Sequence, residues 1–357
     1  MLLTGATGIL GGWVLAEALK REYRPVVLMR DATPEDARER LREVMALADA
    51  PAGPEAVEVV RGDVRKPFLG LSGHDVAELR RRCDVFIHSA ASVSFDPQQG
   101  DHTWDTNVGG LTHALQVAED SGMRFYHVST AYVAGTRTDH VYESDLEEGQ
   151  NFHNAYERSK YECEQMARQA FASGRVQGGV FRPAIIIGAA SNGRIASFYN
   201  FYGFLRLIDT VISGKLDCEG AVVRLPVKPE CTKNLVPVDW CAQAMWEAIA
   251  NDAGDGTTYH ITHPQPVSQG QMIAWANVML EPYHPRVETV EALEENSESP
   301  LEQLTAFWLR HYASYLHDEP TFDRTNIERA APNSPVPPID FELVQKLYAY
   351  ARSEHWQ

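Results

Sequence analysis

MLLTGATGILGG, residues 1–12, is the stretch that decides the fold. An apolar run, Met1–Leu3, leads into a glycine-rich turn and then an amphipathic run over 13–23, which predicts a strand, a tight turn and a helix. Glycines in such a turn allow a tight backbone and a close approach of pyrophosphate to the helix start. We predict a dinucleotide-binding loop, the alternative being an ordinary strand-to-helix turn. Its candidate residues are Gly5, Thr7, Gly8, Ile9, Leu10 and Gly11.

Strands and helices alternate beyond this loop. Apolar runs at 25–29, 55–61, 84–88 and 125–129 indicate strands, and 34–48 and 103–120 indicate helices. Alternation at about thirty-residue spacing is typical of an α/β fold with a doubly wound parallel sheet of the Rossmann type. Ligands of such sheets bind at the carboxyl ends of the strands. Small or polar residues at those predicted ends are further cofactor candidates, namely Asp63, Val64, Ser89, Ala90, Ala91 and Asn107.

Two of these residues have more than one interpretation. Asp63 either accepts a hydrogen bond from an adenine amino group or is a turn aspartate that bonds its own backbone. Asn107 is expected to bridge the backbones of two neighbouring strands.

The residue after the second predicted strand bears on which dinucleotide is bound. An NAD enzyme is expected to carry an acidic residue about twenty residues beyond the loop, where it holds the ribose hydroxyls. Arg30 stands there instead, followed by Asp31. Because a guanidinium pairs well with phosphate, we expect NADP(H), with Arg40 as a second contact to the 2′-phosphate. The alternative is that Asp31 binds the ribose while Arg30 faces solvent.

A tyrosine and a lysine in NAYERSK, residues 154–160, share one helix face, because Tyr156 and Lys160 are four residues apart. A phenol ordinarily titrates near pH ~10, and a neighbouring ammonium favours its ionised form. Thr130 ends the preceding strand and can donate a hydrogen bond to a substrate oxygen. Beside a nicotinamide that carries the hydride, these three side chains predict a hydride-transfer site with Thr130, Tyr156 and Lys160 as its catalytic residues.

The order of several short segments resembles that of the extended short-chain dehydrogenases/reductases over about residues 1–250. The segments are TGATGILG, GDV, HSAAS, TNVGG, VSTAYVAG, YERSK, FRPAIIIG and VPVDW. Within that superfamily, HSAASVSF, HVSTAYVAG and NLVPVDW are similar to fatty acyl-CoA reductases. They are equally similar to the thioester-reductase domains of carboxylic acid reductases and peptide synthetases.

This resemblance implies an NADPH-dependent reductase that converts an acyl thioester to the aldehyde, in some relatives on to the alcohol. It assigns the catalytic hydroxyl to Thr130 rather than Ser129, and it carries over Tyr156 and Lys160 directly. Arg30 matches the phosphate-binding arginine of these relatives. The implied partner is an acyl thioester carried in trans by CoA or by a carrier protein.

The remaining sequence predicts a smaller, C-terminal substrate-binding lobe. In the predicted strand 179–187, the resemblance places Pro183 and Ile185 against the nicotinamide. We assign residues 1–190 and about 232–262 to an NADP-binding Rossmann domain. Residues 191–231 and 263–357 are assigned to the substrate-binding cap. The aromatic segment 197–212 is expected to be a helix that lines an acyl channel or packs between the lobes.

Composition narrows the choice of partners. A net charge of −17 disfavours nucleic acid, and also CoA and acidic carriers unless a basic patch such as 80–82 or 194–206 overrides it. Five cysteines without a CxxC pair indicate a reducing compartment, which we take as the cytoplasm, and no metal site is expected. No apolar run reaches the roughly eighteen residues of a membrane span, so stable membrane insertion is not expected.

Two other functional classes compete with the thioester reductase. One is a different extended short-chain dehydrogenase, either a nucleotide-sugar epimerase or dehydratase, or a ketone reductase. The other is a non-enzymatic member that binds the cofactor as a sensor or scaffold. An epimerase would favour an acidic residue where Arg30 stands, and the intact set of Thr130, Tyr156 and Lys160 argues against a non-enzymatic role. The sequence does not specify the acyl group or the oligomeric state.

Overall fold

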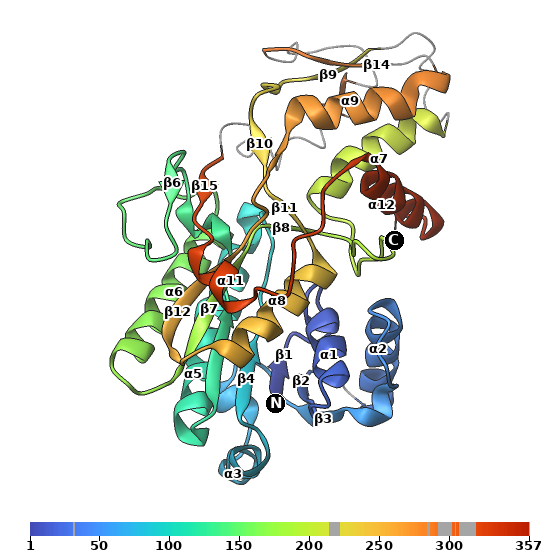
Figure 1. Cartoon of the computed structure of the whole chain (residues 1–357). Coiled ribbons are helices and arrows are strands. Elements are labelled where there is room, and N and C mark those ends of the chain that lie inside the picture. The colour runs from blue at the N-terminus through green and yellow to red at the C-terminus, as the bar shows by residue number, and fades with distance from the viewer. Residues whose placement is uncertain are drawn as a thin grey trace.

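A seven-stranded parallel sheet forms the centre of the molecule (Figure 1). The computed structural model describes residues 1–30, 33–213, 222–283, 286–291, 302–303, 305–306 and 319–356. The strand order is β12-β7-β5-β4-β1-β2-β3. The strands are β1 (Leu2–Thr4), β2 (Val26–Met29), β3 (Glu58–Arg61), β4 (Val85–His88), β5 (Arg124–Val128), β7 (Gly178–Pro183) and β12 (Asp255–Ile261). The order reverses between β1 and β4, where doubly wound sheets bind ligands, and the predicted Rossmann-type α/β fold is confirmed.

Helices cover both faces of this sheet, because its central strands are apolar on both sides. One face carries α1 (Gly11–Lys20), α2 (Pro34–Leu47) and α8 (Val238–Asn251), which share one hydrophobic core. The other face carries α3 (Gly73–Arg82), α5 (Gly110–Ser121) and α6 (Ala155–Ala172), which share a second core. The N-terminal turns of the helices that follow β1 and β5 therefore lie at the carboxyl edge of the sheet, where a ligand would bind.

Two predicted elements are interrupted in the structure. The predicted helix 103–120 consists of α4 (Gly100–Trp104), a π-helical turn at Asp105–Gly109, and α5. The predicted strand 179–187 is split, because the chain leaves the main sheet after Pro183, which has no N–H to continue a ladder. The remainder, β8 (Ile185–Ile187), pairs instead with β11 (Leu235–Pro237).

A separate hydrophobic core defines the upper lobe in Figure 1, the cap. Its helices are α7 (Phe201–Ile212), α9 (Gln269–Leu280) and α12 (Phe341–Ser353). Short strand pairs complete it: β9 (Val222–Leu225) with β14 (Arg286–Thr289), and β10 (Thr232–Lys233) with β13 (Val267–Ser268). Most apolar side chains of α7 are buried, as expected of a core helix.

Part of the segment assigned to the cap lies against the Rossmann domain instead. There β15 (Thr321–Phe322) pairs with β6 (His140–Val141), and α11 (Thr325–Ala330) packs on β12 and α8. The buried Glu143 carboxylate holds this segment, since it accepts from His260 N at 2.8 Å and from Asn326 N at 2.6 Å. This contact joins residues far apart in sequence, which no local pattern predicts.

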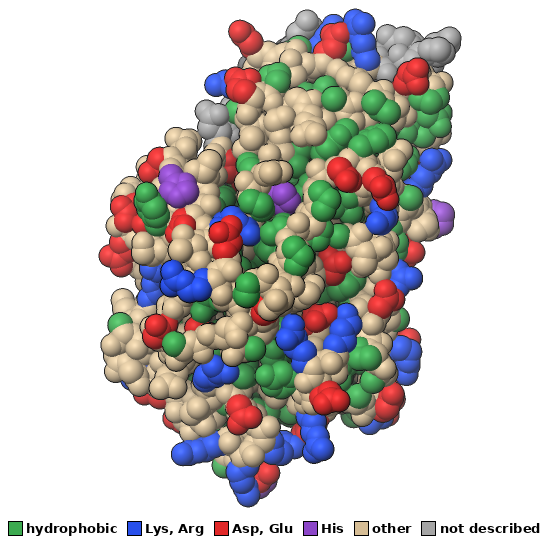
Figure 2. Space-filling model, in the orientation of Figure 1, with side chains coloured by type: hydrophobic (Ala, Val, Ile, Leu, Met, Phe, Trp, Pro, Cys, Tyr) green, Lys and Arg blue, Asp and Glu red, His purple; other side chains and the backbone are tan. Residues whose placement is uncertain are grey.

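Charges of both signs are interspersed over the face seen in Figure 2. Arg82 forms an ion pair with Glu58, and Arg194 forms one with Asp49. These acidic partners offset much of the basic character predicted for 80–82 and 194–206. In the part of the chain that is described, no helix has the length and apolar character needed to cross a bilayer.

Candidate active site

The glycine-rich loop joins β1 to α1 and packs against the end of β4. Gly5 has φ +75°, and a Cβ at this position would lie 2.6 Å from Ala90 N and 2.7 Å from Ser89 C. A Cβ on Gly11 would lie only 1.9 Å from Gly5 O. Because all of these neighbours are backbone atoms, glycine is required at both positions. The loop is thereby held where the strand order reverses.

The same loop forms a cradle that suits an anion. Gly8 is exposed, and a Cβ there would meet only Gly5 O, at 3.2 Å. The N-terminus of α1 has no side-chain cap and no acidic residue in its first turn. The first N–H groups of a helix lack partners within it, so they are available to a phosphate. The N–H of Gly8 already donates to Gly5 O at 3.0 Å, so the candidate donors to the pyrophosphate of a dinucleotide are the N–H groups of Ile9 and Leu10, with Gly8 leaving room for its approach.

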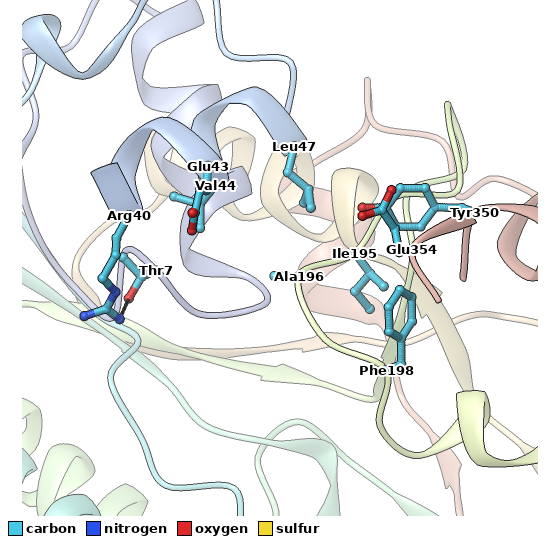
Figure 3. A pocket seen from close by; sticks show the side chains of 10 residues that line it. All are labelled: Thr7, Arg40, Glu43, Val44, Leu47, Ile195, Ala196, Phe198, Tyr350 and Glu354. Atoms are coloured by element: carbon cyan, nitrogen blue, oxygen red, sulfur yellow. Dashed lines mark hydrogen bonds between the residues drawn. The ribbon is translucent and has the colours of Figure 1, made fainter. Parts of the chain in front are cut away.

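Arginines flank this cradle on the side predicted to bind the 2′-phosphate. Arg30 follows β2 and is exposed, whereas Arg40 on α2 donates from Nη2 to Thr7 Oγ1 at 2.9 Å. Arg40 and Thr7 lie at one end of a cavity of about 270 Å³, and Phe198 lies at the other (Figure 3). Asp31, the alternative ribose ligand, lies outside the described residues.

Asp63 is engaged by its own turn. It accepts from Arg65 N at 3.0 Å and from Arg65 Nη2 at 2.9 Å. The side-chain bond to Arg65 is also the main cause that lowers the pKa of Asp63. The structure therefore shows the turn bonds of Asp63, and the adenine contact stays a prediction. The carbonyl of the next residue, Val64, lies 2.8 Å from His113 Nδ1.

Asn107 is buried and joins the segment after β4 to α6. Its Oδ1 accepts from Ser92 N at 2.7 Å, and its Nδ2 donates to Ser92 O at 3.0 Å and to Ser159 Oγ at 2.8 Å. The expectation that Asn107 bridges two neighbouring strands is therefore wrong. Ser92 lies beyond the end of β4, where strand pairing supplies no partners for its peptide N–H and C=O, and Asn107 supplies them instead. Residues 89–91 stay partly exposed beside Gly5, where a cofactor would pass.

Thr130 and Tyr156 meet at the carboxyl edge of the sheet. The Thr130 side chain lies close enough to Tyr156 to act on the pKa of its phenol, and Thr130 Oγ1 donates to Pro183 O at 3.4 Å. The Tyr156 ring lies beside Phe95, with 5.8 Å between ring centroids. Ile185 follows in β8, is partly buried and, like Ile9 of the loop, packs against the hydrophobic core of the cap. The structure thus brings the predicted hydroxyl and phenol together.

Lys160 lies one turn further along α6 and is buried. The start of this helix is fixed by Asn154, whose Oδ1 accepts from Glu157 N at 3.0 Å. Lys160 Nζ donates to Val128 O at 2.7 Å, so its ammonium faces the end of β5. Burial lowers the pKa of Lys160.

The phenol of Tyr156 is in its acid form at neutral pH. Burial raises the pKa of Tyr156, and the neighbouring Thr130 side chain is the largest influence in the opposite direction. The expectation that Lys160 brings this pKa below its ordinary value is therefore wrong here, because desolvation raises the pKa and the charge of Glu157 raises it further. Tyr156 is consequently suited to donate a proton rather than to accept one.

Three residues of this region were not anticipated from the sequence. Phe95 comes from the irregular segment after β4, where no periodic pattern predicts a contact with Tyr156. Glu164 and Arg182 form a buried ion pair behind the site. For Glu164, its spacing of four residues from Lys160 was a signal in the sequence, because it places both side chains on one face of the helix. Among the described residues, no group of three or more His, Cys, Asp or Glu side chains is arranged to hold a metal.

A parallel Rossmann sheet with an anion cradle at the strand-order reversal, followed by the tyrosine and lysine on α6, defines an NAD(P)-dependent oxidoreductase of the extended short-chain dehydrogenase/reductase type. Residues 3–245 match the model of an NAD-binding family described as Male sterility protein, and the chain belongs to that family.

The chain is similar in sequence or in fold to several known proteins. It is 28% identical to the nonribosomal peptide synthetase asaC of Aspergillus flavus over 74% of its own length, and it spans 26% of that relative. The terminal R domain of the myxalamid PKS-NRPS pathway has a similar fold, with a TM-score of 0.82, 23% identity, and coverage of 100% of this chain and 91% of that one. A thiolation-reductase di-domain of an archaeal non-ribosomal peptide synthetase aligns with a TM-score of 0.73 and 20% identity, over 100% of this chain and 91% of that one.

Proposed function

We propose that the protein is an NADPH-dependent reductase that converts an acyl thioester to the aldehyde. The observation that carries this proposal is the meeting of Thr130 and Tyr156, with Lys160 one turn away, at the sheet edge beside an anion cradle. The similarity to a nonribosomal peptide synthetase and to a terminal R domain supports a thioester as the substrate.

The chemistry follows from the placement of these side chains. A reduced nicotinamide bound at this edge would supply a hydride to the thioester carbonyl carbon. The hydroxyls of Thr130 and Tyr156 would hold the carbonyl oxygen and stabilise its developing negative charge. Tyr156 donates its proton to that oxygen, and Lys160 is placed to bind the ribose. The carbon–sulfur bond of the resulting hemithioacetal then breaks, and its hydroxyl proton passes to the leaving sulfur, which gives the aldehyde and the free thiol. Tyr156 regains its proton from solvent, so one hydride and one proton are consumed overall.

A carrier-bound thioester is the form that we favour over acyl-CoA. One structure of similar fold is a thiolation-reductase di-domain, and asaC, a relative in sequence, is a nonribosomal peptide synthetase. The net charge of −17 does not separate the two forms, because it repels CoA and acidic carriers alike and the basic residues Arg82 and Arg194 are paired with acids. Cys83, Cys163 and Cys241 are buried free thiols, which supports the cytoplasm as the proposed location.

The test measures NADPH oxidation by the purified chain with an acyl-CoA or with an acyl-loaded carrier protein. A parallel assay measures conversion of UDP-glucose in the presence of NAD. We expect turnover with a thioester, release of free thiol in equal amount, and an aldehyde or alcohol product. Turnover of the nucleotide sugar alone, or no thiol release, would overturn the proposal. The ratio of kcat/KM for the two thioesters decides between CoA and the carrier.

The preference for NADPH is also a proposal, and it depends on Arg30 and Arg40. Losing a hydrogen bond to a charged group costs about 1.5–3 kcal/mol, so we expect R30A and R40A each to raise the Kd of NADPH about 10- to 100-fold. The Kd of NADH should not change, because NADH lacks the 2′-phosphate. Calorimetry with both cofactors measures this.

R38A is the matched control, because Arg38 is an exposed arginine on the same helix. If R38A weakens NADPH binding as much as R40A does, the effect comes from net charge alone. The assignment of the 2′-phosphate site to Arg40 would then fail.

A further inference from the structure

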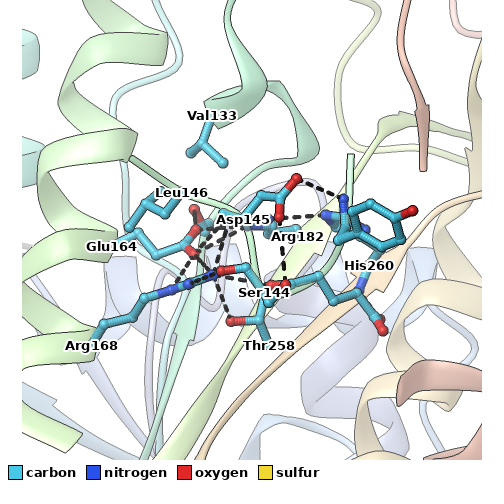
Figure 4. A network of polar contacts seen from close by, with 12 residues as sticks. Val133, Ser144, Asp145, Leu146, Glu164, Arg168, Arg182, Thr258 and His260 are labelled. Carbon is cyan, nitrogen blue, oxygen red and sulfur yellow. Dashed lines mark hydrogen bonds and ion pairs between the residues drawn. The ribbon is translucent and has the colours of Figure 1, made fainter. Parts of the chain in front are cut away.

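A buried carboxylate lies on the helix that carries Tyr156 and Lys160. Glu164 follows Lys160 by four residues and Tyr156 by eight, so all three lie on one face of α6. The Glu164 side chain has no exposed surface. Figure 4 shows the side chains of Arg168 and Arg182 converging on it. A charge this deeply buried is tolerated only when its partners are well placed.

Glu164 is bonded from three directions. Ser129 Oγ donates to Glu164 Oε2 at 2.8 Å. Arg182 donates from Nη2 to Oε1 at 2.7 Å and from Nε to Oε2 at 3.0 Å, and Arg168 Nε donates to Oε1 at 3.0 Å. Burial alone would raise the pKa of Glu164, but the guanidiniums of Arg182 and Arg168 outweigh it and hold that pKa below its ordinary value. The group is therefore an ionised carboxylate with strong, charge-assisted bonds.

These bonds reach both strand ends that hold Thr130. Ser129 directly precedes Thr130, and its backbone N donates to Phe181 O at 2.7 Å. Arg182 directly precedes Pro183, whose carbonyl oxygen accepts from Thr130 Oγ1 at 3.4 Å. One carboxylate on α6 thus connects the helix that bears the phenol to the ends of β5 and β7, which hold the hydroxyl.

The outer side of Arg182 is also fixed. Its Nη1 lies 3.1 Å from His260 Nε2, and its Nη2 donates to Asp145 O at 2.6 Å. His260 Nδ1 lies 2.7 Å from Asp323 O. Burial, then the charge of Arg182, lowers the pKa of His260 to about 3, so the ring is neutral. Since a carbonyl only accepts and a guanidinium only donates, Nδ1 carries the proton and Nε2 accepts from Arg182.

We propose that Glu164 is a positioning residue for the reaction centre, acting through Ser129 and Arg182 to set the distance between the Thr130 hydroxyl and the Tyr156 phenol. This inference rests on the proposed function for its kinetic test. Two donors must reach one substrate oxygen together, and a displacement of about 1 Å at such a site can cost about 100-fold in rate. A purely structural ion pair would stabilise the fold without affecting this distance.

Ser129→Ala is the sharpest variant, because it removes one bond to Glu164 and leaves both arginine pairs in place. We expect its kcat to fall about 10- to 100-fold, with the KM and Kd for NADPH unchanged. E164Q, which also weakens the ion pairs, should lose at least as much. The matched control is Y126F: Tyr126 lies on the same strand, β5, and its hydroxyl donates to Asp252 Oδ2 at 2.8 Å. Y126F loses an equally long bond to a carboxylate but should keep the wild-type kcat.

A second readout does not need turnover. With carbon-13 in the tyrosine rings, the NMR signal of Tyr156, identified by its loss in Y156F, reports on the surroundings of the phenol, including its distance from the Thr130 hydroxyl. We expect S129A to shift this signal and Y126F to leave it in place. If the wild type reduces no thioester, the proposed function fails while this NMR comparison still tests Glu164. Equal kcat in S129A and Y126F, or an unshifted Tyr156 signal in S129A, would overturn the positioning role.

Discussion

Replacing Tyr156 by phenylalanine should lower kcat for thioester reduction by about 10²- to 10⁴-fold, the range that general acid catalysis contributes. The substitution keeps the ring beside Phe95 and removes only the hydroxyl whose pKa responds to the neighbouring Thr130. The Kd for NADPH should not change, because the glycine loop and the arginines are untouched. Single-turnover rates and calorimetry on the same preparation measure both quantities.

Y161F is the control for this prediction. Tyr161 lies on the same helix, where its hydroxyl accepts from Gln165 Nε2 at 3.1 Å, away from the reaction centre. It should keep the wild-type turnover. Burial raises the pKa of Tyr156, so the phenol keeps its proton up to at least pH ~10. The turnover of the wild type should therefore not fall through deprotonation of Tyr156 below that pH. Full activity in Y156F would remove Tyr156 from the mechanism.

Replacing Gly11 by alanine should abolish dinucleotide binding and destabilise the fold. The new Cβ would lie 1.9 Å from Gly5 O, 2.7 Å from Gly5 C and 2.9 Å from Ala6 Cα, all backbone atoms that cannot turn aside. The start of α1 must therefore move away from the loop. We expect the free energy of unfolding to fall by about 1–3 kcal/mol or more. The Kd for NADPH should rise more than about 100-fold, since several charge-assisted bonds of about 1.5–3 kcal/mol each are lost.

Gly203 provides the comparison for the same substitution. It lies inside α7, and a Cβ there would have nothing within 4 Å. G203A should therefore bind NADPH normally and gain about 0.5–1 kcal/mol, because alanine loses less backbone entropy than glycine in a helix. Urea unfolding and cofactor titration of both variants test the pair. A folded G11A protein with wild-type affinity for NADPH would contradict the assignment of the cradle.

The elements that the sequence located well are those with a local signal. The loop at residues 4–11 and the strands that follow it stand where expected, because glycine spacing and apolar runs express the backbone geometry directly. The placement of Tyr156 and Lys160 on one face of α6 follows from helix periodicity alone. The strand that breaks after Pro183 was placed less well, since strand exchange to β11 depends on a partner about fifty residues away in sequence.

The protonation of the site could not be derived in the same way. From the sequence, the Lys160 ammonium stands one turn from the phenol and favours its ionised form. In the fold, Lys160 donates to Val128 O, and burial governs the pKa of Tyr156. Desolvation is a property of everything packed around a group, so it has no signature in a seven-residue motif.

The sequence by itself determined the Rossmann class, the anion-binding loop and the residue types of the reaction centre, because each is encoded by neighbours within one turn or one strand. Only the tertiary structure decided that Glu164 meets Ser129 and Arg182, that Asn107 joins a loop to a helix, and that Asp63 turns to Arg65. Most of these contacts join segments that come together when the sheet assembles, and their energies depend on burial and on competing partners. Neither the burial of a group nor its competing partners can be derived from the order of residues along the chain.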